Sequence, residues 1–167
     1  MCGIIGIASN KPVSINIINS LKKLEYRGYD SAGLATLNNS QIDEKKCSGR
    51  VEELEKILFK NPSKGNIGIG HVRWATHGVP NIINAHPHSS EKVSVVHNGI
   101  IENSDELKKD LETQGFKFKS QTDTEVITLL VTQFLEKSEP LEAVFKTLKK
   151  LKGSFALGII FKNYSDI

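Results

Sequence analysis

The sequence has little cysteine. Of its 167 residues only two are cysteines, Cys2 and Cys47. So few do not suggest the disulfide framework that holds small secreted proteins together. No basic segment precedes the short apolar run at the start of the chain, so a signal peptide is not expected. These absences favour a reducing compartment, and we expect a cytoplasmic protein.

Long apolar runs and a strong net charge are also missing. No run approaches the ~18 residues that span a bilayer, so no membrane segment is expected. Lysine and arginine number 22 and aspartate and glutamate 19, which leaves a net charge of only +3. No tract of basic residues with interleaved aromatic residues is present. The sequence therefore does not indicate a surface for nucleic acid.

The common motifs for metal and nucleotide chemistry are absent as well. The five histidines include the pair His86 and His88, which resembles a metal pair. No His-Glu-x-x-His motif and no Cys-x-x-Cys pair accompanies them, so a zinc site is not predicted. No Gly-x-x-x-x-Gly-Lys loop is present, which argues against nucleotide hydrolysis. We expect no cofactor.

What the chain does contain is an alternation of two apolar patterns. Helical spacing of apolar residues predicts helices over 12–25, 51–58, 103–115, 122–134 and 140–151. Short apolar runs predict strands over 4–7, 34–37, 41–47, 67–72, 93–96 and 154–161. No repeat or linker divides the chain, so we expect one domain of the α+β class. An αββα sandwich fits this order, although the spacing alone does not select it.

The cysteine directly behind Met1 is the first candidate for chemistry. If Met1 is removed, the thiol of Cys2 lies next to a free α-amine, which places a nucleophile and a weak base on one residue. An α-amine titrates near ~7.7–8.0 and a free thiol near ~8.5, so both can act close to neutral pH. The alternative is that Cys2 is incidental, as the isolated Cys47 is taken to be.

Three further polar clusters flank the predicted strands and helices. Arg73 follows a strand and opens a long polar loop, where it could clamp a carboxylate or form a structural ion pair. Asn98 and Gly99 follow the strand at 93–96. They could be a hairpin turn, or an oxyanion hole made by a side-chain amide and a backbone N–H. At the start of a helix, Thr122 is a predicted N-cap, and Asp123 could accept hydrogen bonds from a substrate ammonium.

Longer strings of residues resemble the class II glutamine amidotransferases, the N-terminal-nucleophile hydrolases with a terminal cysteine. The first seven residues, MCGIIGI, carry the first likeness. Four strings narrow the resemblance to the glutaminase domain of the glucosamine-6-phosphate synthase branch: LEYRGYDSAG at 24–33, GHVRWATHG at 70–78, NAHPH at 84–88 and VHNGIIEN at 96–103. The resemblance implies an αββα fold and hydrolysis of L-glutamine to glutamate and ammonia.

The resemblance also implies roles for individual residues. Cys2 would be the nucleophile, and Asn98 with Gly99 would form the oxyanion hole. Arg73 would bind the α-carboxylate of glutamine, and Asp123 would bind its α-ammonium. Further residues expected to bind or enclose the substrate are Trp74 in the lid loop, Thr76, His77, Arg27 and His86.

The same resemblance bears on domains and partners. The family's glutaminase half is longer, with further strands after the one ending near Phe161. We therefore expect residues 1–167 to be a type 2 glutamine amidotransferase domain that is incomplete at its C-terminus. The resemblance implies sugar-isomerase domains, where ammonia would convert fructose 6-phosphate into glucosamine 6-phosphate, and we expect residues 1–167 to contain none of them. The full-length enzyme would be a homo-oligomer. The alternatives are the glutaminase domain of another class II amidotransferase and a non-catalytic glutamine-binding module.

Overall fold

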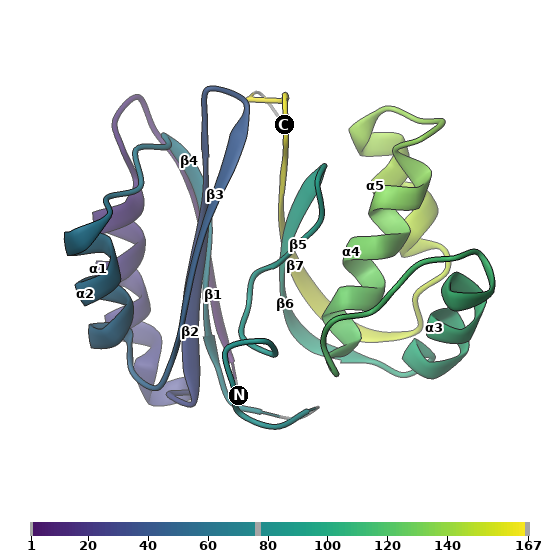
Figure 1. Cartoon of the computed structure of the whole chain (residues 1–167), viewed down its shortest axis with the longest axis horizontal. Coiled ribbons are helices and arrows are strands. Elements are labelled where there is room, and N and C mark those ends of the chain that lie inside the picture. Colours follow the sequence, from purple (N-terminus) through teal and green to yellow (C-terminus); the bar gives the residue numbers. More distant parts are fainter. Residues whose placement is uncertain (1, 76–77, 166–167) are drawn as a thin grey trace.

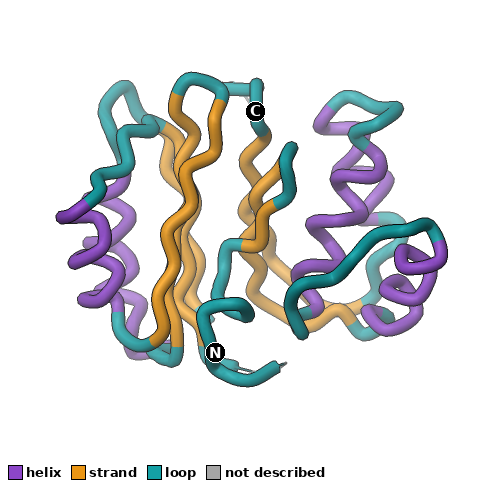
Figure 2. Tube along the Cα trace, in the orientation of Figure 1, coloured by secondary structure: helices purple, strands orange, loops and turns teal. Residues whose placement is uncertain are grey.

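Two antiparallel sheets lie face to face, and helices cover the outer face of each (Figure 1). The computed structural model describes residues 2–75 and 78–165. In Figure 2 the strands form the two inner layers and the helices the two outer ones. This is the αββα sandwich that the sequence predicts. Among the described residues, no helix is both long and apolar enough to cross a bilayer.

The first sheet has four strands in the order β1-β4-β2-β3. Their bounds are Gly3–Ala8, Ile67–Arg73, Ser31–Asn38 and Gln41–Ser48. Two helices, α1 (Ser14–Leu24) and α2 (Val51–Lys60), cover the outer face of this sheet. A short 3-10 turn, η1 (Glu25–Arg27), follows α1. The apolar stripe of α1 is fully buried, and Ile17 packs against Gly70 of β4 so closely that a Cβ there would collide with it. The glycines of β4 therefore allow the close approach of α1.

The second sheet has three strands in the order β5-β6-β7. Their bounds are His88–Ser89, Val93–Ile101 and Gly153–Phe161. The covering helices are α3 (Ser104–Thr113), α4 (Asp123–Phe134) and α5 (Pro140–Leu148). The apolar side chains of α4 pack on β6 in a core that includes Val95, Ile127 and Val131. Among the described residues, β7 is an edge strand of this sheet.

A small apolar cluster joins the two sheets. Ala35, Ile69, Val96 and Ile160 are buried there, two from each sheet. Small and β-branched side chains let the sheets approach, and their strands end close together at one end of the molecule. The sequence predicted these strands without showing which of their ends would meet.

Two strands extend three or more residues beyond a predicted end. β2 begins at Ser31, three residues before its predicted start, because it pairs with β3 on one side and β4 on the other. β6 continues past residue 96 to Ile101, and each of its residues from Val93 onward pairs with β7. Asn98 and Gly99 therefore lie within a strand, and the hairpin-turn interpretation of this pair is wrong. Asn39 and Ser40, both with positive φ, form the turn that joins β2 to β3.

Candidate active site

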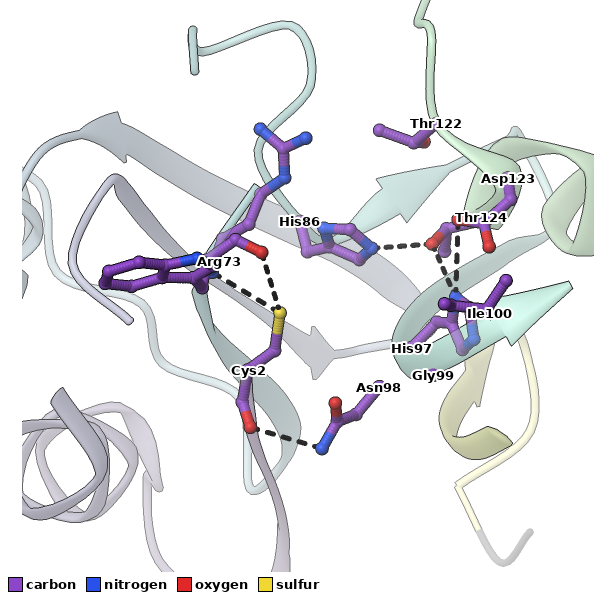
Figure 3. A pocket seen from close by; sticks show the side chains of 11 residues that line it. Cys2, Arg73, His86, His97, Asn98, Gly99, Ile100, Thr122, Asp123 and Thr124 are labelled. Carbon is purple, nitrogen blue, oxygen red and sulfur yellow. Dashed lines mark hydrogen bonds and ion pairs between the residues drawn. The ribbon is translucent and has the colours of Figure 1, made fainter. Parts of the chain in front are cut away.

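A cavity of about 180 Å³ opens where the two sheets and the start of α4 meet. The side chains around it come from the start of β1, the end of β4, from β6, and from the N-terminus of α4 (Figure 3). The lining residues are Cys2, Arg73, Trp74, His86, His97, Asn98, Gly99, Ile100, Thr122, Asp123 and Thr124. Segments far apart in the sequence therefore place a thiol, an amide, a guanidinium and a carboxylate around one space.

Cys2 lies immediately before β1 and is half-buried. The N–H of Trp74 donates a hydrogen bond to its Sγ at 3.4 Å, and the Trp74 carbonyl oxygen lies 3.5 Å from the same sulfur. Burial raises the pKa of the Cys2 thiol above its ordinary value, and the Trp74 N–H opposes that rise. The thiol of Cys2 therefore needs a base to form the thiolate near neutral pH.

Asn98 and Gly99 lie beside the cysteine. The Asn98 side-chain amide donates a hydrogen bond to the Cys2 carbonyl oxygen at 3.2 Å. Gly99 has a φ of 143°, and a Cβ at this position would collide with the carbonyl oxygen of Ser154 on β7. Only glycine fits that backbone without strain. The strand thus places an amide side chain and a glycine next to the thiol of Cys2, and these are the groups from which an oxyanion hole can be built.

Arg73 and Asp123 place opposite charges in the cavity, and both residues are buried. Arg73 ends β4, and its Nη1 lies 3.8 Å from an Asp30 carboxylate oxygen. Arg73 therefore makes the ion pair that the sequence left open, and it also lines the cavity. Its expected role as a carboxylate clamp stays a prediction. Asp123 begins α4, and its Oδ2 accepts a hydrogen bond from the Ile101 N–H at 2.9 Å. Figure 3 shows Arg73 and Cys2 on one side of the cavity and Asp123 on the other.

The other predicted substrate-binding residues are spread more widely. Trp74 is 49% exposed and makes an edge-to-face contact with Tyr29. His86 is buried and lines the cavity. Arg27 does not line it, and its guanidinium instead lies over the ring of Tyr26. Thr76 and His77 fall outside the described residues.

Three buried histidines, His71, His86 and His88, pack together behind the cavity, and no sequence motif predicted this cluster. The rings of His71 and His86 stack with centroids 4.1 Å apart, and His88 meets His86 edge-on at 4.8 Å. Burial lowers the pKa of His71 and of His88 to about 3, and the pKa of His86 falls well below its ordinary value for the same reason. Across the described residues, no group of three or more His, Cys, Asp or Glu side chains is arranged to hold a metal ion.

Two threonines at the start of α4 bond these histidines. Thr122 occupies the predicted N-cap position, but its side chain makes no capping bond. Its hydroxyl lies 2.9 Å from His88 Nε2 instead, so the capping interpretation of this side chain is wrong. Thr124, which no sequence motif singled out, bonds His86 and His97. The only signal in the sequence was the TDTE string itself, which also fits an ordinary helix start.

Comparison with known proteins supplies several matches. The profile of a family described as "Glutamine amidotransferase domain" matches residues 80–167. A curated protein from Bradyrhizobium diazoefficiens is 51% identical over 100% of this chain, and one from Clostridium acetobutylicum is 54% identical over 99%. Both are named glutamine–fructose-6-phosphate aminotransferase (isomerizing). The chain spans 28% of the length of each of these relatives.

Solved structures share the fold. Glutamine phosphoribosylpyrophosphate amidotransferase from B. subtilis matches with a TM-score of 0.83 and 27% identity, over 97% of this chain and 35% of that one. A glutamine aminotransferase class-II domain protein from Silicibacter pomeroyi matches with a TM-score of 0.61 and 12% identity, over 96% of this chain and 72% of that one. The second match concerns the fold alone.

Proposed function

Because this chain belongs to the glutamine amidotransferase family, we propose that it hydrolyses the side-chain amide of L-glutamine to glutamate and ammonia. One observation carries the proposal: Cys2 and Asn98 share a single cavity with the charged pair Arg73 and Asp123. A nucleophile, an oxyanion donor and two charges of opposite sign match the reacting and recognition groups of an α-amino acid amide.

The two charges would hold the head of the substrate. Arg73 binds the α-carboxylate of glutamine, for which its planar guanidinium provides paired donors. Asp123 accepts hydrogen bonds from the α-ammonium. The side chain of glutamine then extends toward Cys2. Trp74, which lines the cavity, helps to enclose the bound substrate. The enclosing roles expected of Thr76 and His77 stay predictions.

The chemistry follows from the position of Cys2. After removal of Met1, the free α-amine of Cys2 takes the thiol proton, and the sulfur attacks the amide carbon. The oxyanion is stabilised by the Asn98 side chain and the Gly99 N–H. The intermediate collapses, the C–N bond breaks, and the α-ammonium returns its proton to the departing ammonia. Water, deprotonated by the same amine, then hydrolyses the thioester to glutamate.

We extend the proposal to the longer relatives through their names. In a protein that carries both this domain and a sugar-phosphate domain, the released ammonia would be transferred to fructose 6-phosphate to give glucosamine 6-phosphate. The cytoplasmic location, the homo-oligomer, the domain limits and the substrate-binding role of Arg27 stay predictions.

The test is the intact mass of the purified chain before and after exposure to a diazoketone analogue of glutamine. We expect loss of Met1 and a single adduct on Cys2, which excess glutamine prevents. A Cys2→Ala variant, which retains Cys47, should gain no adduct but still bind glutamine in a calorimeter. Retention of Met1 would contradict the mechanism. Glutamine binding to the wild-type chain without any adduct would indicate the non-catalytic binding module instead.

A further inference from the structure

We propose that Thr124 is a positioning residue for glutamine recognition, whose single hydroxyl links His86 to His97 and thereby holds the carboxylate of Asp123 in place. The inference deepens the proposed function and rests on it. Thr124 is fully buried at the second position of α4, immediately after Asp123. Its backbone position therefore ties the hydroxyl to the residue that is expected to bind the substrate ammonium.

The hydroxyl of Thr124 bridges two rings. Its Oγ1 lies 2.7 Å from His86 Nε2 and 3.0 Å from His97 Nδ1. Figure 3 shows the hydroxyl between these two rings at the back of the cavity. One hydroxyl donates a single proton, so it donates to one ring and accepts from the other. The three side chains thus form a series of two hydrogen bonds in which the donors all point the same way, either from His97 to His86 or from His86 to His97.

Asp123 determines which of the two rings donates to the Thr124 hydroxyl. His97 Nδ1 lies 3.6 Å from Asp123 Oδ1 as well as 3.0 Å from Thr124. A carboxylate attracts an N–H and repels a bare nitrogen lone pair, so His97 carries its proton on Nδ1. Thr124 accepts from that N–H and donates its own proton to His86 Nε2. Each of the two rings then carries a proton on Nδ1.

The rings have few other anchors. His97 Nε2 and His86 Nδ1 are buried with no hydrogen-bond partner among the described residues. His71 supports the arrangement from the first sheet, because its Nε2 lies 3.0 Å from the His97 carbonyl oxygen and its ring stacks on His86. Thr124 is therefore the polar group that fixes the hydrogen-bonding nitrogens of both rings.

Loss of the Thr124 hydroxyl should affect the binding of glutamine rather than the cleavage of its amide bond. Asp123 is held on one oxygen by the Ile101 N–H, and His97 faces its other oxygen. Without the Thr124 hydroxyl, the His97 ring loses the hydrogen bond that holds its Nδ1 beside that carboxylate. The position of Asp123 then loosens, while the surroundings of Cys2 stay the same. Loss of Thr124 should weaken glutamine binding far more than it slows turnover.

The first experiment compares substitutions at two threonines in the same helix. Thr124→Val removes the hydroxyl at nearly constant volume, and Thr124→Ser retains it. Thr128→Val is the matched control, since Thr128 is equally buried one turn later but bonds only the backbone carbonyls of Thr124 and His88. We expect Thr124→Val to raise KM for glutamine about tenfold, as loss of one such hydrogen bond implies. Its kcat should stay within about threefold.

The controls decide the interpretation. Thr124→Ser should restore KM, and Thr128→Val should lower stability without raising KM. An unchanged KM in Thr124→Val, or an equal rise in Thr128→Val, would overturn the proposal.

Ring nitrogen chemical shifts in ¹⁵N NMR give a readout that does not depend on activity. We expect His86 and His97 to carry the proton on Nδ1 in the wild-type chain, and this pattern to be lost in Thr124→Val. A His97 proton on Nε2 in the wild-type chain would refute the network. If the wild-type chain neither binds nor hydrolyses glutamine, the proposed function fails, and the ring tautomers then decide the Thr124 network alone.

Discussion

The Asn98 amide shows how a single residue is prepared for its proposed role. Its Nδ2 donates to the Cys2 carbonyl oxygen at 3.2 Å, and its backbone is fixed within β6 opposite Ala156. The amide therefore has a set orientation before any substrate arrives. A donor placed in advance stabilises a developing oxyanion without reorganisation, which is the physical basis of its expected effect on rate.

Asn98→Ala should lower kcat by about 10²–10³, equivalent to roughly 2.7–4 kcal/mol of transition-state stabilisation, with little change in KM. Steady-state glutaminase kinetics measure both constants. Asn103→Ala is the matched control, since that side chain bonds the backbone of Lys150 and Lys152 outside the cavity. A comparable loss of kcat in both variants would show that Asn98 acts only on the fold.

At the scale of elements, β6 and α4 position the site. β6 pairs with β7 along its whole length, which carries Asn98 and Gly99 into the cavity as part of a rigid sheet. α4 begins beside it, so Asp123 and Thr124 reach the same space from a helix terminus. A carboxylate in the first turn also interacts favourably with the helix dipole.

Gly99→Ala should be far more destabilising than Gly115→Ala. Both glycines have positive φ, but a Cβ at Gly99 would collide with the β7 backbone whereas a Cβ at Gly115 meets nothing within 4 Å. Gly115→Ala should therefore cost only the backbone strain of roughly 1–2 kcal/mol. Urea denaturation of the two variants gives the comparison. Equal losses would mean that the β6–β7 pairing tolerates a side chain at residue 99.

At the scale of the whole molecule, the buried histidines make stability depend on pH. In the folded chain, burial lowers the pKa of His71 and of His88 to about 3, and that of His86 well below its ordinary value. In the unfolded chain these residues titrate near ~6.5, so between about pH 3 and 6.5 the unfolded state binds more protons. Above about pH 6.5 the stabilisation from keeping these histidines neutral in the fold is fully present. As the pH falls below that value, this stabilisation is lost and the free energy of unfolding decreases.

The free energy of unfolding should fall on acidification by about 1.4 kcal/mol per pH unit for each of these histidines between pH 6 and 4. Urea titrations at several pH values measure the slope. His88→Gln should reduce this slope by the contribution of one histidine, about 1.4 kcal/mol per pH unit. The difference between the two proteins separates the effect of His88 from that of the carboxylates. An identical slope in His88→Gln would show that His88 is not held neutral in the fold.

Much of the fold follows from local pattern. The helices begin within about two residues of their predicted starts because apolar spacing, a turn residue or a proline is a property of neighbouring residues. The extension of β6 could not be predicted this way, since its partner β7 lies more than fifty residues later in the chain. Asn98 and Gly99 have the composition of a turn, and pairing with a distant strand overrides that preference.

The sequence by itself determined the order of the elements, the place of Cys2 behind Met1 and, through its resemblance to a family, which side chains to expect around a substrate. Only the tertiary structure decided that Arg73, Asn98 and Asp123 meet Cys2 in one cavity, and that Thr124 connects the buried rings behind it. The reason is physical. Periodicity is set by residues adjacent in the chain, whereas the convergence of side chains depends on how two sheets and a helix end stack against one another.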